Sequence, residues 1–257
     1  MSIDFSVDGA VATIVLNRPD RLNALDPAHY SALSSAFTLV RDDPTIRVAL
    51  LTGAGDKSFS TGADLKVPMP RLDDLRELSL TQKDLLPNRG MDVWKPIVAA
   101  VNGHCLAGGM CLLLATDIRI ASENATFGLP EIKRGGVPGN GGTQRLLQQL
   151  PYPIAMEMLL YGSTIDAATA LRWGLINKVV APSKLLETAR EHASRLAVGP
   201  PLAVQAAKEL AIRSRDLDLP SGLRLERTIQ YMLNSSHDWR EGGAAFAEKR
   251  APRFEGR

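Results

Sequence analysis

A predicted strand passes into a predicted helix through the segment Asn102-Gly103-His104-Cys105-Leu106-Ala107-Gly108-Gly109-Met110-Cys111. The strand is the apolar run from Pro96 to Val101, and small residues lead from it into an apolar helix. The first backbone N–H groups of a helix have no partner inside the helix, so such a junction leaves them open to a developing negative charge. The segment therefore predicts an α/β arrangement with an anion-stabilising turn.

The same alternation of strands and helices extends through the first half of the chain. Apolar runs predict strands at residues 10–16, 47–52, 96–101 and 117–121. Residues Pro27 to Val40 have helical spacing, with Asp26 as N-cap and Pro27 at the first helical position. Because the apolar runs are continuous, we expect strands that are buried on both faces. This pattern is typical of an α/β core.

From about Gly141 the chain becomes mainly helical. Helices are predicted at residues 143–150, 154–161, 167–173, 184–198, 200–214 and 223–233, with one strand at 175–180. We interpret residues 1–195 as the core that carries the site. We interpret residues 196–257 as a helical region that folds back on this core or contacts other subunits. The polar, proline-bounded stretch from Pro68 to Gly90 is expected to form a mobile helix or loop beside the site.

The composition is that of an ordinary soluble globular protein, with 257 residues, 45% hydrophobic and 23% charged. The net charge of +2 gives no support to a nucleic-acid surface. The sequence shows no long apolar segment and no signal-peptide core at its start. Cys105 and Cys111 are too few for a disulfide framework and match no metal motif. We therefore expect a cytoplasmic protein without nucleic-acid or membrane partners.

Two turns of small residues follow predicted strands. One extends from Ser58 to Leu65, and the other is Ala107-Gly108-Gly109. Each turn can aim one backbone N–H group at a common point, and two such donors form an oxyanion hole. The alternative is that the glycines only permit tight turns and close packing. For either turn taken alone, this alternative is the better interpretation.

Several motifs occur in a fixed order along the chain. They are Leu16-Asn17-Arg18-Pro19, Asn23-Ala24-Leu25, Ser58 to Lys66, Pro96 to Cys111, Phe127 to Glu131, Val137 to Leu146 and Ala245 to Arg250. Together they resemble the enoyl-CoA hydratase/isomerase (crotonase) family over nearly the whole chain. Residues 41–44, 170–174 and 246–257 are most similar to the branch that holds carnitinyl-CoA dehydratases.

The resemblance implies a fold, an assembly and a substrate. The implied fold is a crotonase-like spiral of ββα units with a C-terminal helical trimerisation region, and the implied assembly is a homotrimer or a dimer of trimers. The substrate is an acyl-CoA thioester, so that coenzyme A enters as part of the substrate. Activation by backbone donors and one carboxylate requires no metal and no separate cofactor.

The resemblance also implies which residues form the site. It places the backbone N–H groups of Ala63 and Gly108 on the thioester oxygen, in agreement with the two turns. This oxygen gains charge as the α-carbon loses a proton, so the donors stabilise the transition state more than the bound substrate. The residues implied for coenzyme A binding are Arg21, Leu22, Asp64, Leu65 and Lys66, with Phe246 and Lys249 from the last helix of the same or a neighbouring subunit.

Glu131 corresponds to the second catalytic glutamate of the family, which implies a general acid or base. The alternative for a lone glutamate is a solvated loop carboxylate. Cys111 stands where the hydratases of the family carry their other glutamate. A thiol with a reference pKa of roughly 8.5 replaces a carboxylate poorly, and the apolar Leu112-Leu113-Leu114 favours its neutral form. A nucleophilic Cys111 would need an activating base, for which His104 is a candidate.

These residues leave more than one function open. Double-bond isomerisation moves a proton between two carbons and needs only one base, so Glu131 is sufficient for it. Hydration or dehydration requires help in positioning water, for which Cys111 and Asn140 are the candidates; Asn140 can equally support a positive-φ turn. A third interpretation is a non-catalytic acyl-CoA-binding or interaction protein that has lost the second glutamate.

Overall fold

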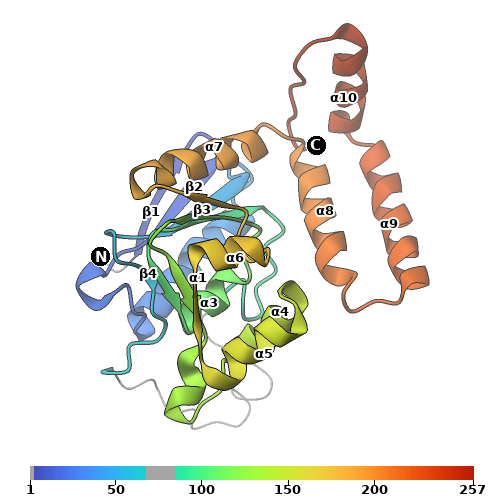
Figure 1. Cartoon of the computed structure of the whole chain (residues 1–257). Helices are drawn as coiled ribbons and strands as arrows, with labels where there is room; N and C mark the ends of the chain where they lie inside the picture. Colours follow the sequence, from blue (N-terminus) through green and yellow to red (C-terminus); the bar gives the residue numbers. More distant parts are fainter. Residues whose placement is uncertain (1–2, 68–84) are drawn as a thin grey trace.

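The computed structural model describes residues 3–67 and 85–257, which form two sheets flanked by helices (Figure 1). The larger sheet has the strand order β1 (Ile3–Asp8), β2 (Val11–Leu16), β3 (Val48–Gly53), β5 (Ile97–Val101), β7 (Ile118–Ser122) and β10 (Lys178–Val180). The smaller sheet has the order β4 (Ser58–Ser60), β6 (His104–Leu106), β8 (Thr126–Gly128) and β9 (Thr164–Asp166). The α/β class predicted from the sequence is confirmed.

The chain alternates between the two sheets in a spiral. Strands β3, β5 and β7 pair in parallel in the larger sheet, and each is followed by a short strand, β4, β6 or β8, that pairs in parallel in the smaller sheet. Every residue of β3 and β5 is buried, as their continuous apolar character predicts. The edges of the two sheets carry antiparallel pairs, β1 with β2 and β8 with β9.

The helices around the sheets are α1 (Pro27–Asp42), α3 (Gly108–Leu113), α4 (Gly142–Gln149), α5 (Tyr152–Tyr161), α6 (Ala167–Arg172) and α7 (Leu185–Ala197). Short 3-10 turns are η1 (Pro19–Arg21), η2 (Pro130–Arg134) and η3 (Pro182–Lys184). Asp26 caps α1 as predicted, since its carboxylate accepts a hydrogen bond from the His29 backbone N–H at 3.0 Å. Helix α7 covers one face of the larger sheet, where Ala189 and Ala193 pack on Leu50 and Val98.

Three C-terminal helices project from this body, namely α8 (Pro201–Arg213), α9 (Leu219–Asn234) and α10 (His237–Glu248) (Figure 1). They are tied to the sheet by an ion pair at 2.7 Å between Lys208 of α8 and Asp117. Arg47 donates hydrogen bonds to the carbonyls of Ala197 and Phe254. Neither α8 nor α9 buries a single residue within this chain. The boundary proposed between residues 195 and 196 stays a prediction.

The structure also corrects some predicted elements. The strand expected at 175–180 covers only Lys178–Val180, and β9 forms in a part of the chain where no other strand was expected. Strand β1 and the short strands of the smaller sheet were not predicted, whereas α10 is the last helix that the resemblance implied for Phe246. Most of the stretch expected to flank the site, residues 68–84, lies outside the described residues.

Candidate active site

The two predicted turns lie backbone against backbone. Gly62 has φ +83°, and a Cβ atom at this position would lie 2.5 Å from the backbone nitrogen of Gly108. A Cβ atom at Gly109 would collide with the carbonyl oxygen of Ser60. The hydroxyl of Ser60 in turn accepts a hydrogen bond from the Gly62 N–H at 3.1 Å. Glycine at 62 and 109 therefore permits a close approach, and the turns bring Ala63 and Gly108 together.

Two buried asparagine side chains fix the strand that leads into the first turn. The amide of Asn23 donates to the carbonyls of Ala54 and Ser58 at 3.0 and 2.6 Å. The amide of Asn102, the first residue of the central segment, donates to the carbonyls of Gly55 and Ser58 at 2.8 and 3.0 Å. Because buried carbonyl groups need such partners, these amides hold the loop before β4 in one conformation.

The backbone N–H groups of Ala63 and Gly108 have no hydrogen-bond acceptor within the described part of the chain. The neighbours of Ala63 are held by Leu25, which donates to the Gly62 carbonyl at 2.8 Å and accepts from the Asp64 N–H at 2.9 Å. A carbon added to Gly108 Cα would lie 3.6 Å from the Ala63 nitrogen. The two predicted donors are therefore adjacent and unpaired, which is the arrangement that an oxyanion hole requires.

The backbone immediately before Gly108 is strained. Ala107 has φ 50° and ψ −125°, a conformation that residues with a side chain adopt only at a cost. This conformation ends β6 and starts α3 at Gly108, whose N–H therefore has no intrahelical partner. Strain of this kind persists where the surrounding structure enforces it, and here the packed turns do so.

Glu131 lies on the short 3-10 turn η2 rather than on an open loop. Its side chain is half-buried, and the Oε2 atom is fully buried without a hydrogen-bond partner among residues 3–67 and 85–257. Burial raises the pKa of this carboxyl group. The solvated carboxylate considered as an alternative is not what the structure contains. An unpaired, desolvated carboxylate is instead typical of a general base or acid.

Cys111 lies one helical turn beyond Gly108 and is buried. Burial, together with the nearby charge of Glu131, raises the pKa of its thiol to about 12. The thiol is therefore neutral at physiological pH, as the apolar surroundings predict, and it is unsuited to act as a base or as a nucleophile. His104 does not share its surroundings, because His104 is exposed and hydrogen-bonds Thr126 through Nδ1 at 2.7 Å.

Asn140 adopts φ 52°, which is the positive-φ turn that the sequence allowed. Its carbonyl accepts a hydrogen bond from Arg145 at 3.3 Å, and Arg145 also donates to the carbonyl of Asn88 at 3.0 Å. No polar contact within the described ranges joins the Asn140 amide to Glu131 or Cys111. Asn140 thus shapes the loop before α4, and a role in holding water stays a prediction.

Tyr30 of α1 lies beside Gly108, although no motif in the sequence points to it. Its hydroxyl lies 3.4 Å from the position that a Cβ atom would take at Gly108. The guanidinium of Arg89 covers its ring, 4.9 Å from the ring centre. Burial raises the pKa of the Tyr30 hydroxyl. No sequence signal identifies this residue, because Tyr30, Leu33 and Phe37 form one ordinary apolar stripe of an amphipathic helix.

The residues predicted to bind coenzyme A fall into two separate groups. One group lies near the first turn, because the Leu22 carbonyl accepts a hydrogen bond from Ser58. Its exposed members are Arg21, Leu22, Leu65 and Lys66. Asp64 is buried beside them, with its carboxylate 2.8 Å from Arg18. Phe246 and Lys249 belong to α10 and its C-terminal end, at the far end of the projecting helices (Figure 1). One chain therefore does not bring the two groups together.

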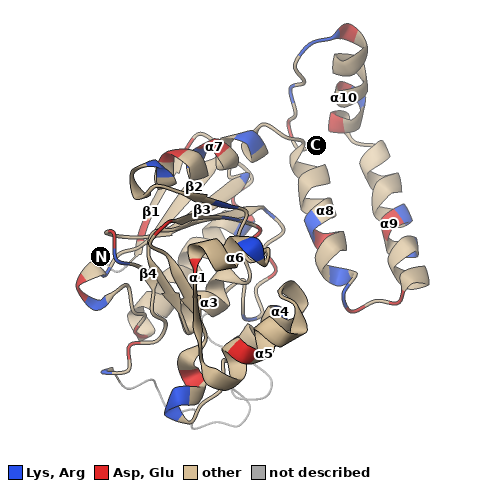
Figure 2. Cartoon of the chain, in the orientation of Figure 1, with Lys and Arg blue, Asp and Glu red and all other residues tan. Residues whose placement is uncertain are grey.

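The surface charges and the helices give no sign of a nucleic-acid, metal or membrane site in the described residues. Acidic and basic side chains are interspersed over the surface elements (Figure 2). The described residues contain no group of three or more His, Cys, Asp or Glu side chains able to hold a metal ion. Across residues 3–67 and 85–257, no helix is long and apolar enough to cross a membrane.

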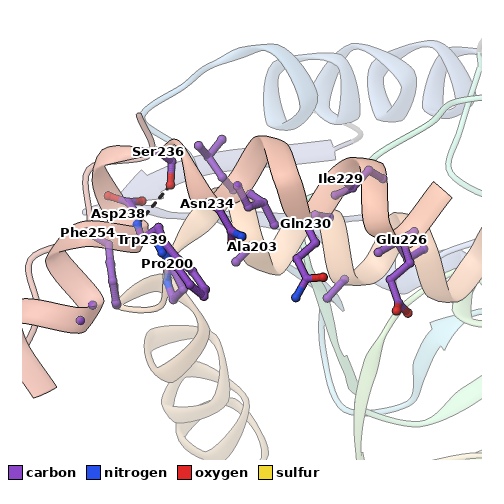
Figure 3. A pocket seen from close by; sticks show the side chains of 17 residues that line it. Pro200, Ala203, Glu226, Ile229, Gln230, Asn234, Ser236, Asp238, Trp239 and Phe254 are labelled. Atoms are coloured by element: carbon purple, nitrogen blue, oxygen red, sulfur yellow. Dashed lines mark hydrogen bonds between the residues drawn. The ribbon is translucent and has the colours of Figure 1, made fainter. Parts of the chain in front are cut away.

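A hollow lies between α8, α9 and α10 (Figure 3). Its lining is mostly apolar and includes Ala203, Ile229, Trp239 and Phe254. Neither Glu131 nor the two backbone donors line it. This hollow is therefore distinct from the candidate active site.

Comparisons with known proteins agree with the motifs. A family model described as enoyl-CoA hydratase/isomerase matches residues 6–257. The chain is 44% identical to the (E)-benzylidenesuccinyl-CoA hydratase of Thauera aromatica, over 100% of both chains. It is 40% identical to the carnitinyl-CoA dehydratase of Proteus mirabilis, over 100% of this chain and 99% of that one. The crystal structure of an enoyl-CoA hydratase from Bacillus anthracis matches with a TM-score of 0.92 and 35% identity, over 100% of both chains.

Proposed function

Since the chain belongs to the enoyl-CoA hydratase/isomerase family, we propose that it catalyses the reversible addition of water to the double bond of an enoyl-CoA thioester. Relatives named as a hydratase and as a dehydratase, each similar over its whole length, support this reaction class. The observation that carries the proposal is the buried, unpaired Oε2 of Glu131 in a site with two unpaired backbone donors.

In the proposed hydration, Glu131 removes a proton from a water molecule, whose oxygen bonds to the β-carbon of the substrate. The electron pair of the double bond moves toward the thioester oxygen, where the N–H groups of Ala63 and Gly108 stabilise the developing enolate. Glu131 then returns the proton to the α-carbon, so one carboxylate completes the proton transfers, and Asn140 is the candidate for positioning the water. The neutral Cys111 takes no part in this proton transfer.

Double-bond isomerisation is the second candidate, and Cys111 favours it. The neutral thiol leaves Glu131 as the carboxylate of the site, and a single carboxylate completes a proton shift between two carbons. Glu131 would remove a proton from the α-carbon of a 3-enoyl-CoA and deliver it to the γ-carbon. The same two backbone donors would stabilise the intermediate dienolate.

The proposal places coenzyme A between two subunits. Arg21, Leu22 and residues 64–66 would contact it from one chain, while Phe246 and Lys249 would cover it from the next. The 88% exposure of Phe246 supports a neighbouring subunit, because a large aromatic side chain is seldom so open to water. A separation of the two groups within one chain also supports this arrangement.

The assembly that we propose is a homotrimer or a dimer of trimers, formed through α8, α9 and α10 in a cytoplasmic protein. These helices expose several large apolar side chains, namely Leu219, Leu223, Tyr231, Met232, Trp239 and Phe246. Exposed apolar surface of this extent is typical of a protein interface.

Product analysis tests the reaction. The protein is incubated separately with a short 2-enoyl-CoA and a short 3-enoyl-CoA. The products are separated by chromatography, and their molecular masses are measured by mass spectrometry. A gain of one water from the 2-enoyl-CoA supports hydration, whereas conversion of the 3-enoyl-CoA at unchanged mass supports isomerisation. Binding of both thioesters without turnover would contradict both reactions and support the non-catalytic alternative.

A further inference from the structure

We propose that the hydroxyl of Tyr30 is a third hydrogen-bond donor to the thioester oxygen, beside the backbone N–H groups of Ala63 and Gly108. This inference rests on the proposed function, because it assigns a role at the same enolate. It adds a side chain to a site whose other donors belong to the backbone.

The geometry brings the three donors to one place. The Cβ position built on Gly108 lies 3.4 Å from the Tyr30 hydroxyl oxygen and 3.6 Å from the Ala63 nitrogen. The backbone nitrogen of Gly108 is also close to this position, because both would be bonded to the same Cα atom. Since residue 108 is a glycine, no side chain fills this space, and a substrate oxygen that lies just beyond the Cβ position can approach all three donors.

The hydroxyl is available for such a contact. No residue in the described ranges forms a hydrogen bond with it, although Tyr30 is 6% exposed. The hydroxyl oxygen keeps some accessible surface, because it is not one of the fully buried polar atoms that lack a partner, so a ligand atom can reach it. The ring itself is held in place by its position on α1 and by the guanidinium of Arg89.

The chemistry favours a donor rather than a base. Burial raises the pKa of Tyr30 above its ordinary value of 10, although the nearby positive charge of Arg89 opposes this shift. The hydroxyl therefore keeps its proton throughout the physiological range and can donate to a developing negative charge. Cys111 itself is neutral and offers no comparable donor.

The test compares Tyr30→Phe with the wild type and with the control Tyr152→Phe, whose side chain is 68% exposed on α5. Loss of one oxyanion donor typically costs about 10²- to 10³-fold in kcat. We expect a loss of this order in Tyr30→Phe, with KM changed by less than about threefold. The melting temperature should stay about the same, since the hydroxyl forms no hydrogen bond within the described residues.

A binding measurement separates this inference from the proposed function. Acetoacetyl-CoA forms a stable enolate, whereas butyryl-CoA has the same chain length and remains a neutral thioester. Tyr30→Phe should bind the enolate of acetoacetyl-CoA at least about tenfold more weakly and butyryl-CoA with unchanged affinity. Equal loss for both ligands, or no loss for either, would overturn the role of Tyr30. A wild-type protein that turns over no enoyl-CoA would instead overturn the proposed function, whatever the binding shows.

Discussion

The Sγ atom of Cys111 packs directly against Gly142, because a Cβ atom added to Gly142 would lie 2.7 Å from the sulfur. The small side chain of Cys111 thus contacts Gly142, the first residue of α4. This contact leaves no room for a longer side chain at position 111 without movement of α4.

Replacement of Cys111 by alanine should preserve turnover. The thiol has a pKa of about 12, so it is neutral at physiological pH. It takes no part in the proposed proton transfers. We expect kcat within about threefold of the wild type and a loss of about 1 kcal/mol in the free energy of unfolding, for the missing packing. Steady-state kinetics and denaturant unfolding measure the two quantities. A hundredfold loss of kcat in a stable Cys111→Ala protein would show that the thiol acts in catalysis.

Glu131→Gln should lose activity by about 10²- to 10⁴-fold, the usual contribution of a general acid or base. The matched control is Glu157→Gln on the outer face of α5, where the glutamate is exposed and activity should not change. Comparable activity in the two variants would remove Glu131 from the mechanism.

The pH profile of the wild type should reflect the raised pKa of Glu131. Because the base must be ionised to accept a proton, kcat/KM for hydration should rise with pH, with a midpoint above the ordinary value of 4.5. No second limb from Cys111 should occur between pH 6 and 10, since that thiol titrates near 12. A profile with its acidic midpoint below 4.5 would contradict the desolvated carboxylate.

The same pKa shift predicts an effect on stability. A carboxyl group whose pKa is higher in the folded than in the unfolded state favours folding at low pH, and this contribution is lost as the pH rises through the folded pKa. Glu131→Gln should therefore have a higher melting temperature than the wild type at pH 7. The difference should vanish below about pH 4, where the wild-type carboxyl is protonated in both states. Equal melting temperatures at both pH values would contradict a cost of burying the charge.

Gly108→Ala tests the open space between the donors. The added methyl group would lie 3.2 Å from Gly62 Cα and 3.4 Å from the Tyr30 hydroxyl, so small shifts accommodate it while it projects into the space proposed for the thioester oxygen. We expect a folded protein with a loss of about 10²-fold or more in kcat. Gly62→Ala should instead destabilise the fold, because its methyl group would meet the Gly108 nitrogen at 2.5 Å. Normal turnover by Gly108→Ala would place the oxygen elsewhere.

Local signals in the sequence predicted the parts of the fold that depend on few residues. Asp26 and Pro27 define the start of α1, and the continuous apolar run at β5 indicates a buried strand. Strands β4, β6, β8 and β9 contain three residues each, which is too short for a periodic pattern, and they form only through pairing with one another. Their existence therefore follows from tertiary structure rather than from local sequence.

In the candidate site, too, local sequence predicted some residues, whereas others depend on the tertiary structure. Ala63, Gly108 and Glu131 belong to recognisable motifs, and the structure brings the two turns together as the motifs predict. Tyr30 has no motif, because an apolar stripe on a helix does not reveal which hydroxyl reaches a site. Phe246 requires a second subunit, and the fold of one chain leaves it exposed.

Exchange of the α-protons of butyryl-CoA in deuterated water tests most directly whether Glu131 and the backbone donors generate a thioester enolate. Butyryl-CoA has no double bond and no β-hydroxyl group, so exchange reports proton removal alone, independently of hydration or isomerisation. We predict deuterium at the α-carbon with the wild type and with Glu157→Gln, and none above background with Glu131→Gln. Exchange at the wild-type rate in a folded Glu131→Gln protein would contradict this prediction.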